Sequence, residues 1–378
     1  MHSLLSLSLL WPGGTRPAQA GTGLDPQCVR DLELENTLAV LTNSRLGRSS
    51  LREVFLTLCT DPAVIAYRQD ILDDLWCNPD FAAHLEALMP DLSALEASPL
   101  STDRRRSPLQ EVAWRLGELE HLVSCVTGLS TMFAQVGDQV RAAGWCTLRD
   151  FIAQTTQDAV YQHLTRALPD MLRTVRAKVS VTIGVNLDSQ LRPVAATLLA
   201  VNDQKFTSST FLDRLFGRRG EDFKGLGPLH TVPNLAQGGG PSVSQGGNPD
   251  LNPLMVPLFR DLAQVLDTVC QPIAQALRQY DTLPSGFLTA LHGDLVFYLA
   301  AVRLMERLRS HGLPVCRPDI APMAERVCEL HEAYNLNLAL HQMAHTDGQA
   351  PIVTNDVHMG DHGRIGILTG PNQGGKTT

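Results

Sequence analysis

The sequence predicts a mainly α-helical protein. A long-helix bundle is interrupted by a β-hairpin and followed by the first strand and phosphate-binding loop of an α/β domain. Three observations support this. Apolar residues recur at three- and four-residue steps over long segments, the period changes to two near residue 180, and a glycine-rich motif lies near the C-terminal end. A helix buries one face with a period of 3.6 residues and a strand with a period of 2, so the change of period indicates a change of structure.

The first long helix is expected to begin at Asp61-Pro62 and to continue through Tyr67–Trp76. Aspartate is a good N-cap, and proline suits the first helical position because its missing N–H is not needed there. Ser107–Gln110 has the spacing of a capping box and starts the next helical pattern. The apolar stripe of that helix is expected to pack against neighbouring helices, and it comprises Leu109, Val112, Leu116, Leu119, Val123 and Val126.

A β-hairpin is predicted after a third, mostly polar helical pattern that extends from Thr147 to about Arg176. Every second residue of Val179–Leu187 is apolar, so one face of this strand is expected to be buried. Asp188–Pro193 supplies turn residues, and Ala196–Val201 supplies a partner strand. The hairpin is therefore inserted between helices.

The segment from about Gly217 to Pro253 is rich in Gly, Pro, Ser and Asn, which predicts a flexible loop. Helices are expected to resume at Leu254, and Pro272 should kink the first of them. The next helix ends with two arginines and Gly312, which suit a helix C-terminus. Its apolar stripe comprises Leu288, Leu291, Leu295, Leu299, Val302 and Met305.

The glycine-rich motif fits G-x-x-x-x-G-K-[ST], the phosphate-binding P-loop, and it follows a predicted strand, Arg364–Thr369. Its glycines allow backbone N–H groups to close around an anion. Lys376 is expected to reach the β- and γ-phosphates, and the Thr377 hydroxyl to bind Mg²⁺, so ATP and Mg²⁺ are the predicted ligands. A glycine-rich turn at a frayed end is the alternative. The motif residues are Gly370, Pro371, Asn372, Gln373, Gly374, Gly375, Lys376 and Thr377.

The string Thr369–Thr378 closely resembles the P-loop of the MutS family of DNA mismatch-repair ATPases. That family has Thr-Gly-Pro-Asn, one variable residue, then Gly-Gly-Lys. Asn355-Asp356-Val357 resembles the segment that precedes this loop in MutS proteins. The resemblance extends over most of the chain, from about Asp31 to Thr378. Further segments that resemble the start of the MutS core or of its ATPase domain are Asp31–Leu34, Tyr67–Leu75, and Tyr334-Asn335 with Leu338.

The resemblance implies a cytoplasmic, DNA-dependent ATPase that in full-length form works as a homodimer on double-stranded or branched DNA. Its role would be mismatch repair or a related DNA-structure transaction, with no membrane partner. The hairpin would correspond to a clamp that grips DNA, and the long antiparallel helices to a lever between clamp and ATPase. A hairpin that only braces the bundle is equally compatible with the residues. The expected divisions are an N-terminal extension (1–26), a helical core and lever (27–178), the hairpin insertion (179–216), a flexible loop (217–253), the returning lever arm (254–333) and the start of the ATPase domain (334–378).

The chain departs from the MutS pattern in two ways. It contains no Phe-x-Glu element, with which MutS sensors detect a mispair, and its core-like segments begin near residue 31. A member without the mismatch-reading domain is therefore expected. The acidic residue that binds Mg²⁺, the signature loop and the dimerising helices follow the P-loop in the family and would lie beyond Thr378. The chain is thus expected to be truncated at the P-loop, with no complete catalytic set and no measurable ATPase activity.

Two other functions remain open on the sequence. One is a non-catalytic helical interaction module or truncated gene product with a vestigial P-loop. The other is an unrelated P-loop ATPase with a helical arm.

The net charge of −8 argues against a protein coated with basic residues for nucleic-acid binding. Contact with DNA would need a local patch, and the DNA-binding residues are not identified. Arg104–Arg106 and Arg218-Arg219 are tight basic clusters, but solvated loop charge is the better interpretation of each.

The eight cysteines are scattered without a C-x-x-C pair, which excludes a zinc site or disulfide framework on spacing. Most are expected to be small buried residues in a reducing cytoplasm. A metal site is also not expected at four histidines near the C-terminal end, which are interpreted as surface-loop residues: His341, His345, His358 and His362.

The N-terminal segment resembles a signal peptide in two respects. Leu4–Trp11 is a short apolar run, and Ala18-Gln-Ala20 imitates a cleavage site. However, Met1–Ser3 contains no Lys or Arg, so a cytoplasmic N-terminal strand or extension is favoured. No other stretch is expected to be long and charge-free enough to span a membrane.

Overall fold

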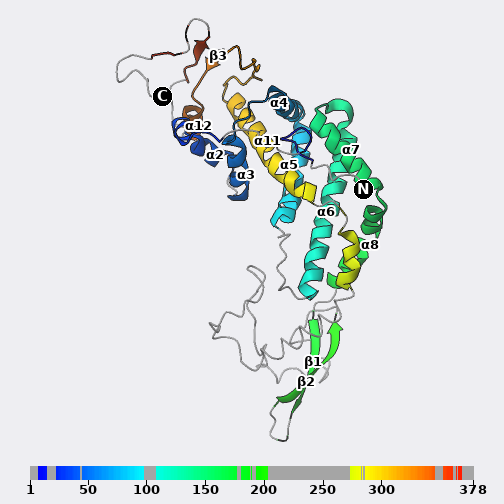
Figure 1. Cartoon of the computed structure of the whole chain (residues 1–378). Helices are drawn as coiled ribbons and strands as arrows, with labels where there is room; N and C mark the ends of the chain where they lie inside the picture. Colours follow the sequence, from blue (N-terminus) through cyan, green and yellow to red (C-terminus); the bar gives the residue numbers. More distant parts are fainter. Residues whose placement is uncertain are drawn as a thin grey trace. The chain divides into compact units, whose positions relative to one another are not determined.

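The computed structural model describes residues 7–14, 23–42, 45–97, 108–176, 180–187, 189, 193–202, 273–281, 283, 286–344, 352–360, 363 and 365–367. In this part the protein is mainly α-helical, as predicted (Figure 1). The α-helices are α1 (Pro26–Asp31), α2 (Leu34–Leu41), α3 (Arg45–Phe55), α4 (Pro62–Cys77), α5 (Pro79–Ala97), α6 (Pro108–Val136), α7 (Ala143–Gln157), α8 (Ala159–Arg176), α11 (Gly286–Ser310) and α12 (Leu336–Ala344). The strands are β1 (Ser180–Leu187), β2 (Pro193–Asn202), β3 (Cys328–Ala333) and β4 (Asn355–Met359), and the 3₁₀ turns are η1 (Gly137–Gln139) and η4 (Arg278–Tyr280).

The chain forms two compact units. Unit 1 comprises Met1–Ala97, Ser124–Thr156 and Ser285–Thr378, and unit 2 comprises Ser98–Val123 and Gln157–Pro284. Helix α6 contributes residues to both units.

Helix α11 is the central helix of unit 1, where it packs against α2, α3, α4 and α5 (Figure 1). Its predicted stripe is confirmed, because all the stripe residues are buried except Met305, which is half-buried. Burial of one leucine side chain contributes about 1.5–3 kcal/mol, so this stripe supplies much of the stability of the unit. One cluster of its core joins residues of α2, α3 and α11, namely Leu38, Leu41, Leu51, Val296 and Ala300.

Helix α11 ends where the sequence predicts. Gly312 has a φ of +74°, a left-handed conformation that favours glycine. The Gly312 amide donates to the Arg309 carbonyl and the Leu313 amide to the Leu308 carbonyl, both at 3.0 Å. These two bonds form a Schellman motif, which satisfies carbonyls that the helix end leaves free.

The start of α4 is also as predicted. Helix α4 begins at Pro62, and the Asp61 carboxylate accepts a hydrogen bond of 2.9 Å from the Ala63 amide. Helix α6 begins at Pro108, while the proposed capping residue Ser107 lies outside the described residues. Most of the α6 stripe is buried, with Val123 half-buried and Leu109 among the side chains not described.

The single helix predicted from Thr147 to Arg176 is wrong, because two helices, α7 and α8, occupy this range. They are separated at Asp158, whose side chain accepts hydrogen bonds from the amides of Val160 and Tyr161 at 2.8 and 3.0 Å. Aspartate competes well for the free amides of a helix start, so it begins a new helix instead of continuing the old one.

The predicted β-hairpin of unit 2 is confirmed. Strands β1 and β2 pair antiparallel, with Ser180 opposite Asn202 and Val185 opposite Ala196. The register shifts between Thr182 and Ile183, which adds a bulge to the ladder. The side chains of both strands lie outside the described set, so the predicted buried face remains a prediction.

Polar contacts within unit 2 hold the segment 273–281 against the helices. The Arg115 guanidinium contacts the carboxylates of both Glu118 and Asp281. His163 Nδ1 lies 2.8 Å from the Tyr280 hydroxyl, and the two rings are stacked. The chain that follows the hairpin insertion therefore returns to a fixed place beside α6 and α8.

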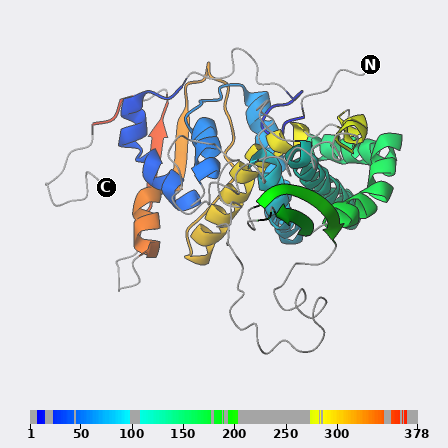
Figure 2. The same ribbon diagram turned by 90° about the horizontal axis from the view of Figure 1, so that it is seen from below.

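Strands β3 and β4 form a second antiparallel sheet in unit 1, with Leu330 opposite Val357. Figure 2 shows this sheet and α12 on the same side of unit 1 as α2. Both strands are largely exposed, and apolar side chains such as Leu330 and Met359 face solvent. Neither face of this small sheet is therefore a packed core.

The prediction that most cysteines are buried is wrong. Of the described cysteines, Cys125 is buried, Cys59 and Cys146 are half-buried, and the remainder are exposed, namely Cys28, Cys77, Cys316 and Cys328. The exposed ones lie on a short surface helix, at a helix end, or in the open segment around β3, where no core is available. Cys270 lies outside the described residues, as do the two arginine clusters, Pro272 and the glycine-rich loop.

Candidate functional site

The predicted nucleotide site lies outside the described residues, which end at residue 367. The placement of Lys376 and Thr377 therefore stays a prediction. The preceding strand, predicted at Arg364–Thr369, is not formed in its described part, because residues 365–367 carry no strand structure. Ile365 and Ile367 are 90% and 87% exposed. A strand needs a neighbour that pairs with its backbone, and none of the described segments pairs with these residues.

The segments that lead toward the P-loop are ordered by polar contacts with one another. The Asp356 carboxylate of β4 accepts a 2.8 Å hydrogen bond from the Glu332 amide, and Glu332 adopts a left-handed φ of 52°. Beyond β4 the chain reverses direction, since Gly360 and Gly363 exchange two backbone hydrogen bonds of 3.1 Å. The Asn335 side chain caps α12 by accepting from the Leu338 amide at 3.0 Å.

Two segments that resemble different parts of MutS proteins meet at α12. The Asn337 amide group donates to the Leu32 carbonyl at 3.0 Å, and its oxygen accepts from the Thr37 hydroxyl at 3.1 Å. The Asp31–Leu34 segment therefore contacts the start of the predicted ATPase region. The residues in contact are about 300 positions apart in the sequence, so periodicity, which reports on neighbouring residues, cannot predict this contact.

The linking segment after α11 is also held against α4. The Arg317 guanidinium contacts the carboxylates of Asp70 and Asp73, and these hydrogen bonds raise the pKa of Arg317. The Gln69 amide group donates to the Pro318 carbonyl at 2.9 Å. These groups are largely exposed, so the ion pairs add little stability, and their main effect is to fix the path of the segment after α11.

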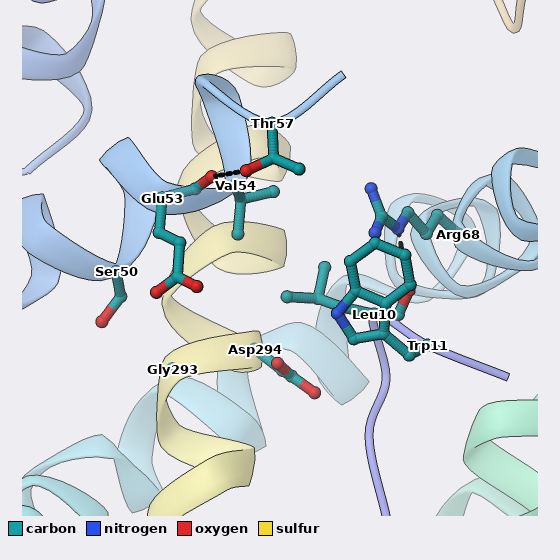
Figure 3. Close-up of a pocket in the computed structure, with 9 residues that line it drawn as sticks. All are labelled: Leu10, Trp11, Ser50, Glu53, Val54, Thr57, Arg68, Gly293 and Asp294. Carbon is teal, nitrogen blue, oxygen red and sulfur yellow. Dashed lines mark hydrogen bonds between the residues drawn. The ribbon is translucent and has the colours of Figure 1, made fainter. Parts of the chain in front are cut away.

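A polar site of unit 1 lies where α3, α4 and α11 meet residues Leu7–Gly14, here called the strap (Figure 3). A cavity of about 200 Å³ there is bordered by both apolar and charged groups. Figure 3 shows Arg68 above the Trp11 ring and Asp294 on α11 facing the strap. The Arg68 guanidinium carbon lies 4.3 Å from the centre of that ring, a distance that permits a cation–π contact.

Asp294 is a carboxylate in the middle of an apolar helix, and only 8% of it is exposed. Burial raises its pKa, while hydrogen bonds from Ser8, Leu9 and Leu10 and the charge of Arg68 lower it in part. Burial also raises the pKa of Tyr67 to about 12, with a further contribution from the charge of Asp294. Asp294 is not among the residues predicted from the sequence, although an Asp between the apolar stripe positions Leu291 and Leu295 was the available signal.

A second buried polar residue of α11 lies two positions earlier. His292 contacts the Glu96 carboxylate of α5, and both belong to unit 1. The two side chains approach each other closely without hydrogen-bond geometry, since neither facing atom has a hydrogen-bond partner. The centre of α11 thus carries one polar contact to the strap and another to α5.

The described residues include no group of three His, Cys, Asp or Glu side chains that could hold a metal ion. His358 lies on exposed strand β4, where it pairs with Glu329 at 3.0 Å. His341 lies within α12 and His358 within β4, so the expected loop position is wrong for both, although both are exposed as expected. His345 and His362 lie outside the described residues.

Within the described part, α11 is long and apolar enough to cross a membrane by length and composition, contrary to the expectation that no such stretch exists. This is weak support for a membrane span, because 56% of its apolar window is buried within the protein and core helices pass the same test.

Comparison with known proteins places the helical part of the chain in a family. A family model described as the MutS2 N-terminal domain matches residues 60–311, the range from the residue before Asp61 through the end of α11. A comparison with curated proteins gives no match. The matched range includes the hairpin and covers more than half of the 378 residues. The chain therefore belongs to the MutS2 N-terminal domain family.

Proposed function

We propose that the chain is the clamp and lever of a MutS2-type protein that binds ATP and engages double-stranded or branched DNA. The observation that carries the proposal is the MutS2 N-terminal domain match over residues 60–311, followed in the same chain by the P-loop sequence at 370–377. A MutS-family helical region and a P-loop in this order favour nucleotide-dependent action on DNA over an unrelated ATPase.

In this proposal the backbone N–H groups of Gly374 and Gly375 bind phosphate, Lys376 neutralises its charge and Thr377 holds Mg²⁺. Nucleotide binding closes a cytoplasmic homodimer and shifts the helical arms. Packed helices move as rigid elements, so they can carry such a shift toward the hairpin.

The contacts of unit 1 support a mechanical link through the segments that precede the P-loop in the sequence. Helix α12 is tied to α2 through Asn337, and the segment after α11 is tied to α4 through Arg317. A displacement of the nucleotide region would therefore pull on α2 and α4 as well as on α11.

Titration with a fluorescent ATP analogue, with and without Mg²⁺, tests the nucleotide part of the proposal. Lys376→Ala should weaken binding at least tenfold, since a lysine contact to phosphate is charge-assisted. Thr377→Ala should reduce the effect of Mg²⁺. Thr354→Ala is the matched control, because Thr354 is an exposed threonine outside the Thr369–Thr378 string, and its affinity should equal that of the unaltered chain.

Fluorescence anisotropy with a labelled duplex and a labelled four-way junction tests the DNA part. Affinity should fall as salt rises, because phosphate contacts release counterions. A mispair in the duplex should not increase affinity, since these 378 residues contain no Phe-x-Glu element, with which MutS sensors detect a mispair. A chain that binds neither nucleotide nor either DNA would instead be an interaction module with a vestigial P-loop.

A further inference from the structure

We propose that the strap holds α4 and α11 together as one body, with Asp294 as the residue that positions α11 against it. The strap crosses both helices, and its backbone is bound by polar groups from each of them in turn. The proposal rests on the contacts of Ser8, Leu9, Leu10 and Trp11.

The contacts with α11 involve two consecutive strap residues. The Asp294 carboxylate accepts from the Ser8 hydroxyl at 2.9 Å and from the Leu9 amide at 2.6 Å. The Tyr298 hydroxyl donates to the Leu9 carbonyl at 2.7 Å. One turn of α11 therefore binds a donor and an acceptor of the same strap residue, which fixes the position of that residue along the helix.

The strap contacts α4 at the two carbonyls that flank Leu9. The Tyr67 hydroxyl donates to the Ser8 carbonyl at 2.8 Å, and Arg68 Nε donates to the Leu10 carbonyl at 2.8 Å. The Arg68 guanidinium also lies over the Trp11 ring. Along the strap backbone the partners thus alternate from α4 to α11 and back to α4. A shift of one helix relative to the other would therefore break hydrogen bonds to the strap.

The strap is also part of the apolar core. Leu7, Leu9 and Leu10 are buried, and Leu9 is fully inaccessible. The bonds of Leu9 to Asp294 and Tyr298 are buried, so breaking one of them leaves a buried group without a partner. The strap therefore resists local opening more strongly than an exposed tail would.

The position of these helices gives the strap its role. Within the matched region, α4 is the first described helix and α11 the last, whereas the strap lies outside the match. Helix α11 is followed by the segment that leads to the P-loop sequence. If the strap fixes α11 to α4, a motion driven by nucleotide binding would displace both helices. The tie between the helices does not itself depend on the proposed function.

Amide hydrogen exchange of the full chain, followed by mass spectrometry, tests the tie. Tyr298→Phe keeps the ring and removes the hydroxyl, and Ser8→Ala removes a hydroxyl with little change of size. Each should increase exchange of the strap amides, and also of amides in α4 and α11, by about tenfold, as expected for the loss of one buried hydrogen bond. Helix α8 in unit 2 should exchange as before.

Tyr334→Phe is the matched control. It removes a tyrosine hydroxyl that donates to the Pro314 carbonyl at 3.0 Å at an exposed place in the same unit, and α4 and α11 should be unaffected. Faster exchange confined to residues 7–14 in Ser8→Ala, with α4 and α11 unchanged, would show that the strap does not tie the helices and would overturn the proposal. Failure of ATP binding leaves this result intact, so the two proposals can fail separately.

Discussion

Asp294 shows how one charged residue in an apolar helix can organise a segment far away in the sequence. Its burial is compensated by donors from the strap and by the nearby charge of Arg68. Desolvation nevertheless dominates and raises its pKa. The folded state therefore binds this proton more tightly than the unfolded chain does, whose aspartate has the ordinary value of 3.8.

We expect the free energy of unfolding to include a component that is fully present below pH 3.8 and is lost as the pH rises through the raised pKa of Asp294. Asp294→Asn carries no titrating proton, so this component should be absent. Urea unfolding at a series of pH values measures it as the difference between the two proteins. Glu306→Gln, an exposed residue of the same helix, is the control and should keep the full pH dependence.

Gly144 allows a close approach of α7 to α4. A Cβ at this position would lie 2.6 Å from the Tyr67 hydroxyl and 2.7 Å from Ile71 Cδ1. Gly144→Ala should therefore destabilise unit 1 by about 1–3 kcal/mol, the usual cost of overpacking. It should also displace Tyr67 from the Ser8 carbonyl.

Urea unfolding checks this prediction, with Gly117→Ala as the control. Gly117 is a helical glycine with open space around its Cβ position, so alanine there should stabilise by up to about 1 kcal/mol through helix propensity. Equal effects of the two substitutions would contradict the close approach.

At the scale of elements, helix boundaries are decided by single polar residues. The break between α7 and α8 occurs at Asp158, where the side chain satisfies two amides of the new helix. Asp158→Ala should cost about 1 kcal/mol, the usual effect of removing an N-cap. Asp150→Ala removes an exposed aspartate within α7 that caps no helix, and it should cost less. Urea unfolding that ranks them in the opposite order would contradict the capping role.

The predicted hairpin and the predicted strand at Arg364–Thr369 have opposite outcomes for the same physical reason. The hairpin β1–β2 forms because its two strands lie close in sequence and pair at eight positions. The pattern at Arg364–Thr369 is equally apolar, but residues 365–367 remain unpaired and exposed. Strand propensity alone does not form a strand without a paired neighbour.

At the scale of the whole molecule, we expect a polypeptide of residues 1–378 alone to show no measurable ATP turnover. Phosphoryl transfer depends on positioning and charge neutralisation by several groups, and Lys376 with Thr377 supplies a part of them. A phosphate-release assay with and without DNA measures this. Turnover that Lys376→Ala abolishes and Thr354→Ala leaves unchanged would contradict the prediction.

The sequence by itself determined the helical class, the hairpin, the ends of α4 and α11, and the MutS relation now placed in the MutS2 N-terminal domain family. These follow from local patterns, because periodicity, caps and motifs are written in neighbouring residues. Only the tertiary structure decided that the strap lies in the core of unit 1 and is bound to Asp294 and Arg68. The contact with Asp294 joins residues 285 positions apart and the contact with Arg68 joins residues 58 positions apart. Hydrophobic burial, which brings them together, is non-directional and leaves no periodic trace in the sequence.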